Sequence, residues 1–221
     1  MPEAKVGEKT SLDRKEFLEL KSKGDKVKIR IASANYYYEG KHFVKQSDDS
    51  WDVTSCSRVN EEFDCELCEQ YFTIKKEVKK ATDSKDEEAA KNLDKEARKV
   101  KPNISFYYPV LDRDTHIAAI FRTTLMVRLA LEEKVDEGID ILNVDWVVKR
   151  TEKPGSYYSL SRVDSADTPE LTKDEKAEIK KAKKMNVGEI VGGKKGTMDF
   201  DKSDKLDDDI EKALDESGVL N

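Results

Sequence analysis

Apolar and polar residues alternate most clearly over residues 26–32, whose sequence is Lys-Val-Lys-Ile-Arg-Ile-Ala. Successive side chains of a strand point to opposite faces, so the β-branched residues would face a core. Lys26, Lys28 and Arg30 would then form a cationic outer face, although an ordinary solvated strand face is the alternative. Further strand patterns cover residues 104–111, 116–121, 139–150 and 157–163.

Residues 69–101 have a different composition, dominated by lysine, glutamate and alanine. Apolar residues recur here at helical intervals, and Ser84 and Glu87 have the spacing of a capping box. We therefore expect two helices that break near residues 82–85. Their apolar stripe is thin, which predicts a protruding hairpin inserted between strands.

The order of these patterns favours a mostly β fold with helical insertions. About five strands, interrupted by one insertion and by a helix over 123–135, fit a small Greek-key barrel better than a parallel sheet. We predict four parts along the chain: an N-terminal arm (1–24), a barrel core (25–164), a Lys-rich segment (165–198) and an acidic tail (199–221). The arm includes a short helix at 10–21. The Lys-rich segment begins with a helix whose capping box is Thr172 and Glu175 and ends with a linker at 192–196.

Charge is unevenly distributed along the 221 residues, of which 40% are charged. The formal charge of −6 belongs to residues 199–221, which contain nine acids and three lysines, whereas residues 1–198 hold 38 bases and 38 acids. The low overall pI therefore does not argue against a nucleic-acid partner. No stretch approaches the roughly 20 apolar residues of a membrane span, and the N-terminus lacks an apolar signal core. These features predict a cytoplasmic protein without membrane contact.

The sharpest chemical pattern is formed by His42, Cys56, Cys65 and Cys68, spaced His-x13-Cys-x8-Cys-x2-Cys and including every cysteine of the chain. Three sulfurs and one imidazole complete the tetrahedral shell of a structural Zn²⁺ and leave no open position. The alternative is that the cysteines are small core residues or free thiols. We favour one structural zinc, and we interpret His116 as a structural histidine and not as a fifth ligand.

Aromatic residues occur in adjacent pairs or triplets with basic residues among them. Two neighbouring rings on a strand cannot both face the core, so at least one ring of each pair is expected to face outward. Rings along a cationic groove hold single-stranded nucleic acid without sequence preference, although core packing is an even alternative for each ring. The candidate DNA-binding residues are Lys28, Arg30, Tyr36, Tyr37, Tyr38, Lys41, Arg58, Tyr107, Tyr108, Arg113, Arg122, Trp146, Lys149, Arg150, Tyr157, Tyr158 and Arg162.

The segment around the four candidate ligands resembles the helix-destabilising single-stranded DNA-binding protein family of T-even bacteriophages. The resemblance is carried by Tyr-Tyr-Glu-Gly-Lys-His-Phe (37–43), by Cys56, and by Asp-Cys-Glu-Leu-Cys-Glu-Gln-Tyr (64–71). The resemblance extends over residues 12–163. It implies an OB-fold core containing a zinc subdomain (36–72), whereas the predicted helical insertion (73–101) is longer than the family leads us to expect.

The resemblance also implies a function: nonspecific binding and protection of single-stranded DNA in phage replication, recombination and repair, without catalysis. The acidic tail would recruit replication or recombination proteins and occupy the DNA groove when DNA is absent. The N-terminal residues 1–10 are not basic, so we expect at most weak self-association on DNA. If the chain is phage-encoded, the infected bacterial cell is its location.

Two other classes of function compete with this one. The first is a zinc-containing protein-interaction or transcription-regulating module. The second is an enzyme such as a deaminase or nuclease. A deaminase is disfavoured because His42 is followed by Phe43-Val44 and not by the His-x-Glu of deaminases, and a nuclease because no clustered set of acids suggests a two-metal site.

Overall fold

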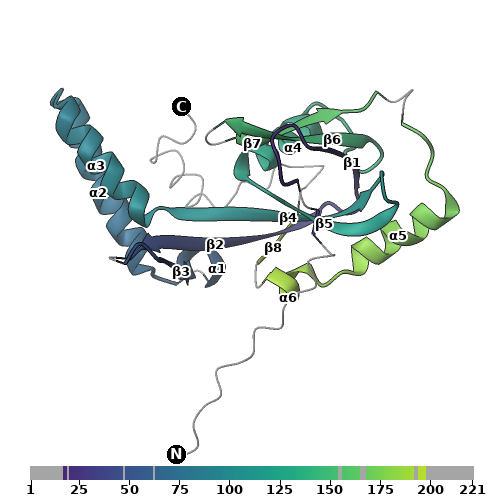
Figure 1. The fold of residues 1–221 in the computed structure, drawn as a ribbon, viewed down its shortest axis with the longest axis horizontal. Coiled ribbons are helices and arrows are strands. Elements are labelled where there is room, and N and C mark those ends of the chain that lie inside the picture. Colours follow the sequence, from purple (N-terminus) through teal and green to yellow (C-terminus); the bar gives the residue numbers. More distant parts are fainter. Residues whose placement is uncertain are drawn as a thin grey trace, which may run out of the picture.

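The computed structural model describes residues 17–18, 20–46, 48–61, 63–153, 156–164, 168–191 and 194–197. This part of the chain forms a curled antiparallel sheet with helices at its ends and along one side (Figure 1). The strands are β1 (Lys26–Ile31), β2 (Asn35–Lys45), β3 (Trp51–Ser55), β4 (Pro102–Asp112), β5 (Ile117–Thr123), β6 (Asp145–Lys153), β7 (Ser156–Arg162) and β8 (Lys194–Thr197). The helices are α1 (Ser57–Glu61), α2 (Glu66–Asp83), α3 (Glu87–Val100), α4 (Leu125–Asp136), α5 (Lys173–Lys184) and α6 (Val187–Val191).

Strand β4 is the centre of the sheet. One of its edges pairs with β5, and its other edge pairs first with β2 and then with β1. Strands β6 and β7 continue from β1 as a hairpin, so β5, β4, β1, β6 and β7 are successive neighbours. These five strands make a half-barrel, which confirms the predicted mostly β class with helical insertions.

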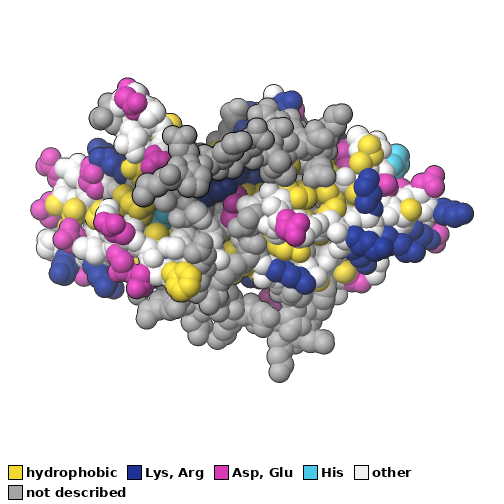
Figure 2. All heavy atoms as spheres, turned by 90° about the horizontal axis from the view of Figure 1, so that it is seen from below, with side chains coloured by type: hydrophobic (Ala, Val, Ile, Leu, Met, Phe, Trp, Pro, Cys, Tyr) yellow, Lys and Arg dark blue, Asp and Glu magenta, His cyan; other side chains and the backbone are white. Residues whose placement is uncertain are grey.

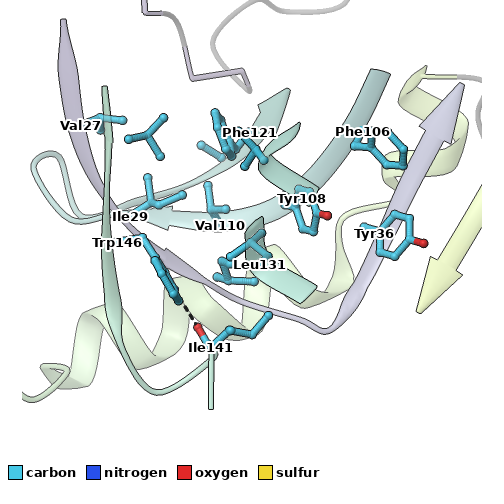
Figure 3. Packing of buried hydrophobic residues seen from close by; sticks show 14 of the residues in the cluster. Val27, Ile29, Tyr36, Phe106, Tyr108, Val110, Phe121, Leu131, Ile141 and Trp146 are labelled. Carbon is cyan, nitrogen blue, oxygen red and sulfur yellow. Dashed lines mark hydrogen bonds between the residues drawn. The ribbon is translucent and has the colours of Figure 1, made fainter. Parts of the chain in front are cut away.

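The core lies inside this curl, where the alternation of β1 buries its apolar side chains. Val27, Ile29 and Ile31 are all buried, as the pattern predicted. Helix α4 covers one end of the core with Val127 and Leu131. Trp146 is 1% exposed and its indole N–H donates to the carbonyl of Ile141 at 3.1 Å, so its polar atom is satisfied (Figure 3).

The helical hairpin predicted over residues 69–101 is present as α2 and α3, which project from one end of the long strands β2 and β4 (Figure 1). Its details differ from the prediction. Helix α2 begins at Glu66, inside the Cys-x2-Cys segment, and α3 is capped by Asp86, whose side chain accepts from the Ala89 amide at 3.0 Å. Ser84, the predicted cap, donates instead to the carbonyl of Ala81 at 2.9 Å.

Two local predictions are wrong because tertiary pairing overrides the local pattern. Of the residues expected in a helix over 10–21, the described ones (17, 18, 20 and 21) are not helical: Phe17 forms a bridge with Ile120, and the Leu18 amide donates to the Ile120 carbonyl at 2.9 Å. The rest of that segment, 10–16 and residue 19, lies outside the described residues. The expected linker contains strand β8, which pairs with β2 from Asn35 to Tyr38. Gly196 is required there, because a Cβ would meet the Tyr36 ring at 2.5 Å.

The predicted Lys-rich helix is α5, and its capping box is present: the Thr172 side chain accepts from the Glu175 amide at 3.2 Å. The predicted acidic tail over 199–221 and residues 1–16 of the predicted N-terminal arm (1–24) lie outside the described residues. Within the described part of the chain, no helix is both long and apolar enough to cross a membrane.

Candidate metal centre and nucleic-acid cleft

Four buried side chains converge at one end of the sheet. The ligand atoms of His42, Cys56, Cys65 and Cys68 all lie within 4.8 Å of one another. The Cys56 and Cys68 sulfurs are 3.4 Å apart, and Nε2 of His42 is 3.3 Å from the Cys65 sulfur and 3.6 Å from the Cys68 sulfur. Adjacent ligands of a tetrahedral zinc are separated by about 3.5–3.8 Å, given Zn–S and Zn–N bonds of about 2.3 and 2.1 Å. The predicted cluster can therefore hold one metal ion.

Backbone contacts bring these four side chains together from three elements. Strand β2 supplies His42, Cys56 precedes α1, and Cys65 and Cys68 stand at the start of α2. The Cys56 amide donates to the carbonyl of Gly40 at 2.9 Å, which ties the α1 loop to β2. Gly40 has no room for a side chain, because a Cβ would lie 2.6 Å from that of Val59.

The imidazole of His42 is oriented by the helical hairpin. Its Nδ1 lies 2.8 Å from the carbonyl oxygen of Val100, the last residue of α3. A carbonyl can only accept, so Nδ1 carries the proton and Nε2 turns its lone pair toward the three sulfurs. The α2–α3 hairpin is thereby connected to the metal cluster through its second helix.

A hydrogen bond shares one proton between the Cys56 and Cys68 sulfurs. The hydrogen bond from Cys68 lowers the pKa of Cys56 to about 4, and the same bond raises the pKa of the Cys68 thiol. A divalent cation would replace the shared proton and allow all three sulfurs to ligate as thiolates. With four protein ligands, all of them buried, the shell has no position open to a substrate.

A second candidate site is a cleft of about 610 Å³ to which several strands of the sheet contribute. Five of the predicted DNA-binding residues line it, each from a different strand: Lys41 from β2, Tyr107 from β4, Arg122 from β5, Arg150 from β6 and Tyr158 from β7. The rest of the wall is formed by Phe17, Leu18, Leu20, Lys21, Glu39, Ile190 and Val191.

Arg122 is an accessible cation of this cleft. It is exposed, and its guanidinium donates to the Ser105 hydroxyl at 3.0 Å. Among the described residues no carboxylate lies within 4.0 Å of it, so its charge is available to an anion. Lys41, in contrast, pairs with Glu39 at 2.8 Å.

Tyr107 forms the floor of the cleft. It is 3% exposed and its hydroxyl donates to Glu39, while burial and that hydrogen bond raise the pKa of the phenol. The expectation that one ring of each adjacent pair faces solvent is wrong for Tyr107 and Tyr108, since both are buried. Phe17 and Val187 cover the outward ring of Tyr107, and the loop and α6 that supply them are distant in sequence.

Five other candidates are buried in the structure, where no phosphate or base can reach them. Arg30 was expected on the outer face of β1, but it is 5% exposed and its Nε donates to Asp145 at 2.6 Å. Arg113 donates to the same carboxylate at 3.1 Å. Asp145 stands opposite Arg30 on β6, a pairing that the pattern of β1 alone cannot reveal. The five buried candidates are Arg30, Tyr36, Tyr108, Arg113 and Trp146.

The remaining candidates lie outside the cleft lining. Arg58 is half-buried, pairs with Glu69 and lies 5.2 Å over the Phe72 ring. On β1 and β2, three candidates are half-buried: Lys28, Tyr37 and Tyr38. On the β6–β7 hairpin, three are exposed: Lys149, Tyr157 and Arg162.

Sequence reasoning missed the apolar residues of the cleft wall. Leu18 and Leu20 come from the segment expected to be helical, and Ile190 and Val191 come from α6. The available signal was the helical spacing of Val187, Ile190 and Val191 after the Lys-rich helix.

Comparisons with protein-family models, curated proteins and solved structures gave no match to this chain.

Proposed function

We propose that this protein binds single-stranded DNA without sequence preference and performs no catalysis. The observation that supports this best is the cleft, where Lys41, Arg122 and Arg150 stand beside Tyr158 although they come from separate strands. Cations beside an aromatic ring suit a strand whose phosphates and bases alternate, and such binding needs no base-edge readout.

The strand order supports an OB-fold as the finer description of the sheet. Counting the five half-barrel strands along the chain, the first (β1) pairs with the second (β4) and the fourth (β6), the second with the third (β5), and the fourth with the fifth (β7). Helix α4 lies between the third and the fourth strands. OB-folds bind oligonucleotides on the face of their second and third strands, which is where Tyr107 and Arg122 lie.

Zinc is the metal we propose for the cluster, because three thiolates and one imidazole in a closed tetrahedral set are typical of structural zinc. His42 would ligate it through Nε2, and the three cysteines through sulfur. The ion's contribution is structural: it would fix the end of β2 where Lys41, the neighbour of His42, enters the cleft lining.

The acidic tail extends this proposal to partners. We expect residues 199–221 to recruit replication or recombination proteins and to compete with DNA for the cleft. A phage-encoded protein acting in the infected cell is consistent with these roles.

The first test of this function is a fluorescence-anisotropy titration of labelled oligo-dT at several salt concentrations. Binding should weaken steeply with salt, because each phosphate contact to a single strand contributes about −0.7 to the log–log slope. Arg122→Ala should lower the affinity about 10-fold and make the slope about 0.7 shallower. Arg98→Ala, which removes an equally charged and exposed side chain from α3, should change neither quantity.

The preference for single-stranded over double-stranded DNA separates the proposed function from its alternative, a zinc-containing protein-interaction module. A large preference for single-stranded over double-stranded oligonucleotides is expected. If neither is bound in a salt-dependent way, the proposal fails, and the zinc-containing protein-interaction module becomes the better reading of the fold.

A further inference from the structure

The hairpin of β2 and β3 has one face directed away from the metal cluster. His42 points toward the sulfurs, so its neighbours Lys41 and Phe43 point to the opposite face, together with Lys45. Strand β3 adds to this face, because Trp51 pairs with Lys45 and Val53 with Phe43. Cross-strand partners share a face, so two cations, two aromatic rings and a valine lie together.

Trp51 is unusually accessible for a tryptophan. Its side chain is 61% exposed and that of Val53 is 50% exposed, whereas the other tryptophan, Trp146, is 1% exposed. A tryptophan at the end of an edge strand contributes little to the core, and its exposure costs hydration free energy. An exposed ring of this kind beside lysine is a feature that a ligand can explain.

The face is continuous with the cleft. Lys41 lines the cleft and also begins the series Lys41, Phe43, Lys45 along β2. Lys45 lies four residues after Lys41 on the strand, which corresponds to about 13 Å. A strand leaving the cleft at Lys41 would therefore pass directly over Phe43 to Trp51.

We propose that this hairpin face is a second DNA subsite, in which Trp51 stacks a base of the strand that leaves the cleft and Lys45 contacts its phosphate. The inference rests on the proposed function and specifies a binding residue for it. Lys45 pairs with Asp49 at 2.5 Å, but both side chains are largely exposed. Such surface pairs contribute little, so a phosphate can replace the carboxylate.

Trp51 is also its own reporter, because the chain has two tryptophans and the other is buried. Oligo-dT of increasing length should quench the Trp51 emission once the oligonucleotide is long enough to pass beyond the cleft. Trp51→Phe, which removes the emission and keeps an aromatic face, provides the background signal of Trp146.

Affinities of the variants, measured by anisotropy of a labelled oligo-dT, test stacking directly. Trp51→Leu keeps apolar bulk without a π face and should weaken binding of long oligonucleotides about 5- to 100-fold. Trp51→Phe should stay within about 3-fold of the natural sequence, since any aromatic face can stack a base. Circular dichroism and metal content should be unchanged in both variants, because Trp51 is exposed.

The outcomes separate the subsite from the function. If long oligo-dT binds but leaves Trp51 emission unchanged, and Trp51→Leu binds as tightly as the natural sequence, the subsite is refuted and DNA binding by the cleft stands. An equal loss of affinity in the Phe and Leu variants would also refute stacking. If no oligonucleotide binds the natural sequence, both proposals fail.

Discussion

His42 and Lys41 are neighbours that serve the two sites of the molecule from opposite faces of one strand. His42 is fully buried among the sulfurs, and Lys41 lines the cleft. A metal bound at His42 therefore restrains the backbone of Lys41 directly. This adjacency predicts that loss of the metal affects DNA binding as well as stability.

Cys65→Ser tests the metal centre at the level of one atom. Removing a thiolate from a closed shell should lower the metal content from one ion per chain and reduce the free energy of unfolding by more than about 4 kcal/mol. Thr54→Ala, opposite His42 on β3 but exposed, is the control and should cost little. Metal analysis and chemical denaturation measure both effects; unchanged stability in Cys65→Ser would contradict a structural zinc.

The four residues of the candidate metal site could be predicted because their spacing is local, whereas the partner of Arg30 could not be predicted from its neighbours in the sequence. His42 and Cys68 are 26 residues apart and belong to one hairpin and the helix after it. Arg30 meets a carboxylate 115 residues away. An alternating strand pattern identifies the two faces of a strand, but what covers the outer face depends on segments that pair later in the chain.

At the scale of elements, α5 is held to the barrel by a buried ionic network. Arg113 joins Asp145 of β6 to Glu175 of α5, and Nδ1 of His116 lies 2.7 Å from the same Glu175 oxygen. Ala182 packs on Ala32 and Ala118 nearby. His116 was expected at the start of a strand, but it lies in the turn before β5; it contacts this carboxylate and is not among the four clustered residues of the candidate metal site.

This docking also determines which face of α5 meets solvent. Glu175 is buried and Glu178 half-buried, where it accepts from the Ala118 amide at 2.9 Å. The lysines point outward, and Figure 2 shows Lys and Arg side chains gathered at the end of the molecule where α5 lies. The exposed lysines are Lys173, Lys176, Lys180, Lys181, Lys183 and Lys184.

The helix itself was predictable from its capping box, but its docking was not. Glu175 completes the capping box with Thr172, a local role that fully accounts for its presence in the sequence. Its second role depends on Arg113, which is 62 residues away. Strand β8 was missed for a similar reason: the glycines in and before it suggest a linker, yet Gly196 is the residue that lets the chain approach Tyr36.

Glu175→Gln should loosen α5 in a pH-dependent way. Burial raises the pKa of Glu175, but the hydrogen bonds from Thr172, His116 and Arg113 outweigh it and lower the pKa from 4.5 to about 2. The folded pKa is the lower one, so the stabilisation is complete above about pH 4.5 and is lost as the pH falls toward 2. At pH 7 the variant should lose about 3 kcal/mol of unfolding free energy.

Urea denaturation between pH 7 and pH 3 measures this difference. The gap between the natural sequence and Glu175→Gln should narrow as the pH falls. Asp174→Asn, which removes an exposed carboxylate from the same helical turn, is the control and should show a small, nearly constant effect. A gap that does not change with pH would show that the carboxylate charge is not what docks α5.

At the scale of the whole molecule, the net-neutral body has two cationic surfaces for one acidic tail. One is the cleft with Lys41, Arg122 and Arg150, and the other is the lysine face of α5; no residue of α5 lines the cleft. The tail of net charge −6 is attached after β8, which pairs with β2 beside the cleft. Proximity therefore favours the cleft as its target.

Deleting residues 199–221 should tighten binding of oligo-dT roughly 3- to 30-fold at about 0.05 M salt, and the gain should shrink toward 0.5 M, where screening shortens the range of charge competition. A second chain keeps the full length and replaces the nine acids by Asn and Gln. If charge causes the competition, the neutralised chain will bind oligo-dT as tightly as the deletion does; if the bulk of the tail causes it, only the deletion will bind more tightly.

An affinity that is unchanged or weaker in both chains would contradict competition at the cleft and point to the lysine face of α5 as the tail's site. Replacing Lys180, Lys183 and Lys184 by Gln then decides between the two surfaces. If the tail is held on α5, these substitutions release it to compete with DNA. The affinity for oligo-dT should then fall in the full-length chain and stay unchanged in the chain without residues 199–221.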